Sequence, residues 1–232
     1  IVGGIGFMVM LDVLRCRGRF RKLTLHSKVV LSTTAVLILG GAMLLWLTEP
    51  ISFLAALFQS ITTRTAGFST IDIGAMTNAG LLVIMILMFI GASPGSTGGG
   101  IKTTTFFVLL SGIYSAATNH SERAFHNAIP KDAFRKASVI SMLAVFLVMT
   151  ASYLMLIFDP QLSLRDVLFE MISAFSTSGL STGITPQLSA QSRILSIIMM
   201  YIGRLGPLTV ASLWYFTIGE RVRYPEGTIA IG

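Results

Sequence analysis

Charged residues are scarce in this sequence. Aspartate, glutamate, lysine and arginine make up 12% of its 232 residues, whereas an ordinary soluble domain has about 25%. Hydrophobic residues make up 53%, and the mean hydropathy is +0.78. The single cysteine, Cys16, excludes an intrachain disulfide and a cysteine-based metal cluster. This composition argues against a soluble enzyme and favours a membrane protein.

Long apolar runs extend over residues 29–47, 137–158 and 194–218. Each is close to the roughly 20 residues that a helix needs to cross a bilayer core. Three such runs predict an all-α, multi-pass membrane protein. The apolar opening up to Leu14 is shorter, and we expect it to be the second half of a further helix.

The net charge of +7 is concentrated in loops. Basic residues cluster in 15–28 and 123–136 and after the last run, whereas Glu49 and Asp159 mark the opposite ends of the apolar runs. Because basic loops stay cytoplasmic, we expect these loops and the C-terminus to face the cytosol, in a protein of the plasma (inner) membrane. The charge is thus explained by topology, with no nucleic-acid partner.

The runs repeat as two units. Cytoplasmic loops on both sides require an even number of crossings, so the short apolar piece 51–61 must enter and leave on the outer side as a re-entrant segment. The same order recurs from residue 137, with 164–175 as the second re-entrant piece. Gly67 aligns with Gly179, and Gly91 with Gly203, at one offset of 112 residues (179 − 67 and 203 − 91).

We therefore predict repeated units of outer helix, re-entrant pore helix with filter loop, and inner helix. The expected segments are 1–28, the end of an inner helix and a cytoplasmic loop; 29–118, one repeat; 119–136, a cytoplasmic loop; 137–222, the next repeat; and 223–232, a cytoplasmic tail.

The loop after each re-entrant helix has the composition of an ion filter. Irregular backbone at membrane depth is tolerated where its carbonyls line a wet cavity, and rings of such carbonyls replace the hydration shell of potassium. Glycine, which adopts positive φ freely, lets successive carbonyls face one axis, and the helix C-terminus favours a cation. A glycine that only turns the chain is the alternative, which recurrence in register disfavours. The predicted filter comprises Thr65, Ala66, Gly67, Phe68, Thr177, Ser178, Gly179 and Leu180, with potassium on the backbone carbonyls of Thr65, Gly67, Thr177 and Gly179.

Two further features lie in the inner helices. Residues 91–100 contain five glycines and a proline, which cannot continue a helix in lipid; the alternative to a functional loop is a kink for packing. Arg204 lies midway along the last run, where a charge is costly and marks function. Lys102 is either a pore residue or a side chain that extends to the cytosolic surface.

These motifs resemble those of the Trk/Ktr/HKT superfamily of potassium transporters. The matching stretches are 62–70, 91–103, 176–183 and 201–209, and the loop 129–132 with the short tail is most similar to the KtrB group of bacterial membrane subunits. The resemblance covers essentially the whole chain.

The resemblance implies four repeats around one pore, of which this chain holds the end of the second and all of the third and fourth. It implies an intramembrane gate beneath the filter, and a basic residue, Arg204, beside the pore, with Lys102 as the weaker candidate. It also implies potassium as the transported ion, no cofactor in this chain, and a homodimer in the lipid bilayer on a cytosolic ring of nucleotide-binding regulatory subunits. The gate residues would be Gly91, Gly95, Ser96, Thr97, Gly98, Gly99 and Gly100.

Two alternatives differ in function. The first is a sodium-permeable or sodium/potassium-coupled transporter of the same fold. The second is an intramembrane hydrolase, because residues 179–183 match the G-x-S-x-G pattern. A nucleophilic Ser181 needs a nearby base, yet His26, His120 and His126 all lie in predicted cytoplasmic loops. We therefore predict a transporter with no catalytic residues.

Overall fold

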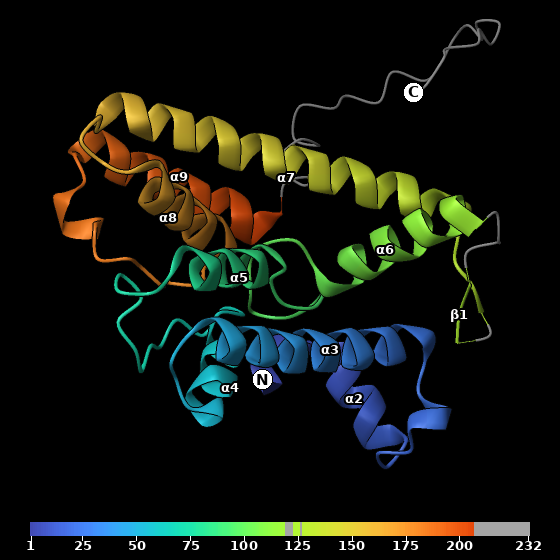
Figure 1. Ribbon diagram of the computed structural model, residues 1–232. Coiled ribbons are helices and arrows are strands. Elements are labelled where there is room, and N and C mark those ends of the chain that lie inside the picture. The colour runs from blue at the N-terminus through green and yellow to red at the C-terminus, as the bar shows by residue number, and fades with distance from the viewer. Residues whose placement is uncertain (119–122, 126, 207–232) are drawn as a thin grey trace, which may run out of the picture.

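Two long helices frame the protein. The computed structural model describes residues 1–118, 123–125 and 127–206. Helices α3 (Leu25–Thr48) and α7 (Lys131–Phe158) run along opposite sides of it (Figure 1). Their apolar lengths, Leu25–Thr48 and Asp132–Phe158, suffice to cross a membrane. At about 1.5 Å per residue they measure about 36 and 42 Å, so each is the outer helix of one repeat.

Shorter helices fill the space between this pair, and the sequence of outer, pore and inner helix occurs twice. The helices α5 and α9 begin at Asn78 and Ala190, again 112 residues apart (190 − 78). The remaining elements are α1 (Val2–Ile5), α2 (Phe7–Arg15), the 3-10 helix η1 (Phe20–Lys22), α4 (Phe53–Thr62), α5 (Asn78–Phe89), α6 (Thr103–Thr118), α8 (Leu164–Ser176), the 3-10 helix η2 (Thr185–Gln187) and α9 (Ala190–Leu205). The mostly helical architecture confirms the predicted fold class.

Some details were not anticipated. A two-residue hairpin, β1 (Arg123–Ala124) and β2 (Asn127–Ala128), lies in the loop before α7. The helix α9 ends at Leu205, followed by Gly206 at φ +92°, so Arg204 lies in the last turn of the described helix and not midway along it. The rest of that apolar run, the aligned motif residues 207–209, the tail, His120 and His126 lie outside the described residues.

Hydroxyl side chains begin the main helices. In each case the side chain accepts a hydrogen bond from the backbone N–H three residues later, which satisfies one of the free donors at a helix start. The capping residues of α3, α4, α5, α8 and α9 are Thr24, Ser52, Thr77, Ser163 and Ser189.

A carboxylate joins the end of each outer helix to the start of its inner helix. Glu49 Oε1 accepts hydrogen bonds from the backbone N–H and the hydroxyl of Thr77, at 2.9 and 2.6 Å. Asp159 Oδ2 does the same for Ser189, at 3.1 and 3.0 Å. Both carboxylates are buried, with exposed fractions of 8% and 4%. The segments between them therefore enter and leave on one side, which is the geometry of a re-entrant loop.

The pKa of Asp159 is lowered, first by a hydrogen bond from the Ser192 side chain and then by those from Ser189. A carboxyl with a depressed native pKa stabilises the fold at pH values above its unfolded pKa of about 3.9. That stabilisation is lost as the pH falls through the lower native value. Acidification therefore weakens the junction between α7 and α9.

The two repeats share their core. One cluster surrounds Met155 and Phe175 in the fourth repeat. The other surrounds Leu45 and Ile84 of the third repeat, yet it includes Phe169 from α8 of the fourth. Because Phe169 is fully buried, the pore helix of one repeat is held by the helices of the other.

We expect the Glu49→Ala variant to be less stable. It leaves the amide and hydroxyl of Thr77 without their acceptor, and an unsatisfied buried group costs about 1–3 kcal/mol. The measurement is the thermal unfolding midpoint of the complete protein in detergent. Asp72→Ala, which removes an exposed carboxylate from the same outer surface, is the matched control. Equal midpoints for the two variants would show that the Glu49 junction contributes nothing.

Candidate functional site

The loop after α4 returns sharply at the helix end. The Thr62 hydroxyl donates to the carbonyl of Phe68 at 2.6 Å and accepts from the Phe68 N–H at 2.9 Å. Within this closed loop Thr65 has φ +75° and Gly67 has φ +80°. A positive φ is freely available to glycine, but for a β-branched threonine it is an outlier. The chain is thus held in an unusual conformation at two positions, one residue apart.

The loop after α8 has the same backbone pattern. Thr177 has φ +53° and Gly179 φ +86°, at the positions 112 residues beyond Thr65 and Gly67 (177 − 65 and 179 − 67). Here the Ser173 hydroxyl closes the loop by donating to the carbonyl of Leu180 at 2.6 Å. Both loops therefore alternate left-handed residues with others at the C-terminus of a pore helix.

The two loops touch each other. The Ser178 hydroxyl donates to the Thr63 carbonyl oxygen at 3.2 Å. A Cβ placed on Gly67 would overlap the carbonyl oxygen of Ser178, whereas a Cβ on Gly179 would meet nothing closer than the Gly67 Cα at 3.9 Å. The third and fourth pore loops thus meet backbone to backbone, and at this contact Gly67 has no space for a side chain.

The glycine-rich stretch between α5 and α6 lies directly against both loops. A Cβ on Gly98 would lie 2.7 Å from Thr65 Oγ1, and one on Gly99 would lie 2.8 Å from Thr177 Oγ1. The Gly99 N–H donates to Thr177 Oγ1 at 3.2 Å. The structure therefore brings the predicted gate residues and the predicted filter residues into one site.

Backbone hydrogen bonds hold this stretch in place. Its two ends are joined by the Ile101 N–H, which donates to the Phe89 carbonyl at 3.1 Å. On its other side the Ser93 N–H donates to the Gly4 carbonyl at 3.0 Å, and the Phe7 N–H to the Gly95 carbonyl at 3.2 Å. The stretch is therefore a defined loop that is attached to the N-terminal helices.

The two predicted basic residues lie beside this loop. Lys102, which is half-buried, donates from Nζ to the Gly98 carbonyl oxygen at 2.6 Å. Arg204, from the end of α9, is close enough to Lys102 for the two positive charges to repel each other. The structure thus places a cation from each repeat next to the glycine-rich stretch.

Glu170 is a site residue that the sequence analysis missed. It lies on α8 with 9% of its surface exposed, and its Oε1 accepts hydrogen bonds from the hydroxyls of Ser181 and of Thr185, the latter at 3.2 Å. These contacts attach the returning chain after Gly179 to the pore helix. The position equivalent to Glu170 in the third repeat is Phe58 (170 − 112), so repeat symmetry gave no signal for it.

The same contacts bear on the hydrolase alternative. The Ser181 hydroxyl is bonded to Glu170 and lies 2.9 Å from Thr185 Oγ1. Of the three histidines, only His26 lies in the described part of the chain, near the start of α3. The arrangement of Ser181 is that of a structural hydrogen bond.

Half of a membrane pore assembled from repeated pore loops is the class of protein that this fold and site define. Comparison with known proteins identifies the family, because residues 22–216 match the TrkH family, described as cation transport protein. The chain belongs to the TrkH family of cation transport proteins.

Several relatives align with the whole chain. It is 37% identical over 249 residues to the Ktr system potassium uptake protein B of Vibrio alginolyticus, covering 100% of this chain and 54% of the relative. It is 36% identical over 250 residues to the potassium/sodium uptake protein NtpJ of Enterococcus hirae, covering 100% of this chain and 55% of the relative. The chain thus spans about half the length of these relatives. They carry the names of transporters and not of enzymes.

A solved structure has the same fold. The potassium transporter TrkH from Vibrio parahaemolyticus matches with a TM-score of 0.73 at 16% sequence identity, over 92% of this chain and 50% of that chain. At this identity the likeness concerns the fold alone.

We expect the Glu170→Leu variant to loosen the fourth pore loop. Without its acceptor, the return at Ser181 and Gly183 loses charge-assisted hydrogen bonds of about 1.5–3 kcal/mol, so amide hydrogen exchange there should rise by roughly tenfold or more. Phe58→Leu, at the equivalent position of the third repeat, is the matched control. Unchanged exchange at residues 181–183 in Glu170→Leu would mean that Glu170 does not position this loop.

Proposed function

We propose that this chain forms half of a potassium-conducting pore that takes up potassium across the plasma membrane. The observation that carries the proposal is the meeting of two pore loops with the same backbone pattern, Thr65 with Gly67 and Thr177 with Gly179, above one glycine-rich stretch. The names of the potassium-uptake relatives support the choice of ion.

In this proposal the backbone carbonyls of the two loops take the place of water around a dehydrated potassium ion. Residues of alternating backbone handedness turn successive carbonyls towards one axis. The strain of a threonine at positive φ, of order 1–3 kcal/mol, is tolerated because Thr62 and Ser173 close the loops by hydrogen bonds. The C-terminal ends of α4 and α8 add partial negative charge beside the cation.

Residues 91–100 act as the gate in this proposal. The loop touches the filter residues at Gly98 and Gly99, so an ion leaving the filter meets it at once. Lys102 holds the loop through the Gly98 carbonyl, and Arg204 adds a second positive charge that discourages cations until the loop moves. Opening would be a shift between two arrangements of this loop.

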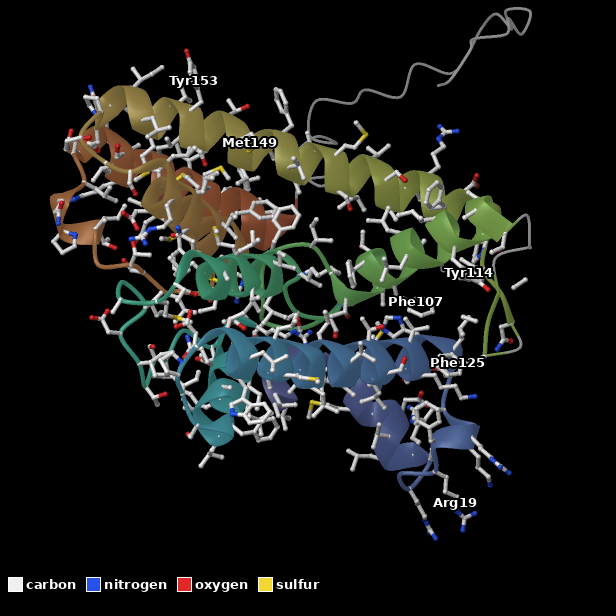
Figure 2. The ribbon with its side chains drawn as sticks, in the orientation of Figure 1. Arg19, Phe107, Tyr114, Phe125, Met149 and Tyr153 are labelled. Carbon is white, nitrogen blue, oxygen red and sulfur yellow. The ribbon has the colours of Figure 1, made fainter. Side chains whose placement is uncertain are left out.

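The proposed setting follows from topology and from the relatives. The end of the molecule that carries Arg19 and Phe125 (Figure 2) is the cytoplasmic end. The Ktr system names of the relatives support a homodimeric membrane subunit on a cytosolic ring of nucleotide-binding regulatory subunits. The complete protein would have four repeats, so this half alone would not conduct.

A sodium-permeable or sodium/potassium-coupled pore is the second candidate. The relative from Enterococcus hirae, named a potassium/sodium uptake protein, supports it. Uptake of each ion by the complete protein, in cells that lack other potassium importers, distinguishes the candidates. Potassium uptake that is independent of sodium supports the first, and potassium uptake that requires sodium supports the second.

We expect Gly67→Ala to reduce potassium selectivity over sodium more than Gly179→Ala. Both changes strain the backbone by about 1–2 kcal/mol, but only the Cβ on Gly67 displaces the Ser178 carbonyl of the other loop. The measurement is the ratio of potassium to sodium uptake by the complete protein. Gly40→Ala, in α3 with open space around it, is the control. A wild-type ratio in both filter variants would remove these loops from the filter.

We expect Lys102→Met to raise potassium flux several-fold while leaving selectivity unchanged. The change removes the hydrogen bond to the Gly98 carbonyl and one positive charge below the filter, and a lost charged bond is worth about 1.5–3 kcal/mol. Shortening the loop within residues 95–100 should have the same direction of effect.

The control for Lys102→Met is Lys136→Met, which removes an exposed lysine of α7. Flux is measured as rubidium or potassium uptake per folded protein in vesicles. If flux falls, or if the loop deletion remains closed, residues 91–100 are a structural kink and the gate lies elsewhere.

A further inference from the structure

An apolar groove opens between the two repeats on the side of α7. It has a volume of about 450 Å³. Helices α5, α6, α7 and α8 all contribute to its walls, through residues that include Leu82, Ile86, Phe106, Leu109, Val145 and Ile172. The groove is separate from the filter, and nothing in the proposed permeation path uses it.

The surface of the groove suits only an apolar occupant. Its one lining hydroxyl, that of Ser141, is covered by neighbouring atoms and has no hydrogen-bond partner in the described part of the chain. A polar ligand or an ordered water needs two or more hydrogen-bond partners, which such a wall does not provide. A hydrocarbon chain needs none.

The groove opens onto a surface that faces lipid. Along the same helix, Met142 and Phe146 are 74% and 65% exposed, and Figure 2 shows the position of Met149 on α7. From Ser141 to Met149 the helix rises about 12 Å. This length fits within the depth of one leaflet, about 15 Å, or half of the hydrocarbon core.

We propose that one acyl chain of a membrane phospholipid occupies this groove. Its head group would lie at the start of α7, where Arg135 and Lys136 are exposed and form no ion pair with any described residue, so an anionic phosphate suits this end. The groove narrows towards that end because Phe134 of α7 packs against Gly112 of α6. A single acyl chain enters such a space from the side, whereas a helix about 10–12 Å across does not.

The occupant would touch the proposed gate. Ile90 and Ile101, which flank residues 91–100 and pair through a β-bridge, both line the groove. An acyl chain there supports both ends of the loop from the lipid side. This consequence, and the assignment to the cytoplasmic leaflet, rest on the proposed function and topology; the binding site itself does not.

Photo-crosslinking of the complete protein in lipid nanodiscs tests the site. The probe is a phosphatidylglycerol with a diazirine on its acyl chain, and adducts are located by peptide mass spectrometry. We expect adducts on Phe106 and Leu109 of α6 in the unchanged protein. Val145→Trp fills the groove and should lower their yield at least tenfold, whereas Met142→Trp, on the exposed face of the same helix, should leave it unchanged.

Ile86→Trp enters the groove from α5 and should repeat the result of Val145→Trp, which covers the case that one variant does not fold. Arg135→Gln should lower the yield with phosphatidylglycerol but not with a phosphatidylcholine probe. Adducts confined to Met142 and Phe146, equal yields in the Val145→Trp and Met142→Trp variants, or crosslinks between two copies of the chain at the groove would overturn the proposal. Because potassium uptake is not measured, a failure here is independent of the proposed function.

Discussion

The carboxylates at the ends of the outer helices fix the depth of the pore loops. Glu49 and Thr77 are 28 residues apart in the chain, and Asp159 and Ser189 are 30 apart, yet each pair is in direct hydrogen-bond contact. Each junction forces a pore helix and its return into one enclosed excursion. Without this junction, α4 and α8 would have no reason to stop midway and turn back. The positions of Gly67 and Gly179 opposite each other follow from it.

The loops at the bottom of these excursions combine strain with support. Thr65 and Thr177 adopt a backbone conformation that their side chains disfavour, and hydroxyls of Thr62 and Ser173 keep the loops closed around them. The glycine-rich stretch then approaches so closely that larger residues at Gly98 or Gly99 would collide with the loops. Rigid backbone above and small residues below form one continuous site.

Sequence periodicity predicted the helical repeats well because they are set by local hydrophobicity and by an offset that holds from Gly67 through Asn78 to Gly91. It predicted the positive φ of Gly67 and Gly179 because glycine signals that conformation. It did not reveal the positive φ of Thr65 and Thr177, since threonine normally signals strand. The carboxylate junctions and Glu170 were also missed, because contacts between distant residues leave no local pattern and Glu170 has no counterpart in the third repeat. The filter and gate roles remain proposals.

The difference between Glu170 and Phe58 has an evolutionary consequence. In a pore made from identical subunits, one codon change alters every loop at once, and a mutation must be tolerable in all of them simultaneously. Here the repeats are consecutive parts of one polypeptide, so each pore loop can mutate by itself. The fourth loop has acquired an acidic support that the third lacks. Selection can thus adjust one quadrant of such a ring while the others preserve the ancestral chemistry.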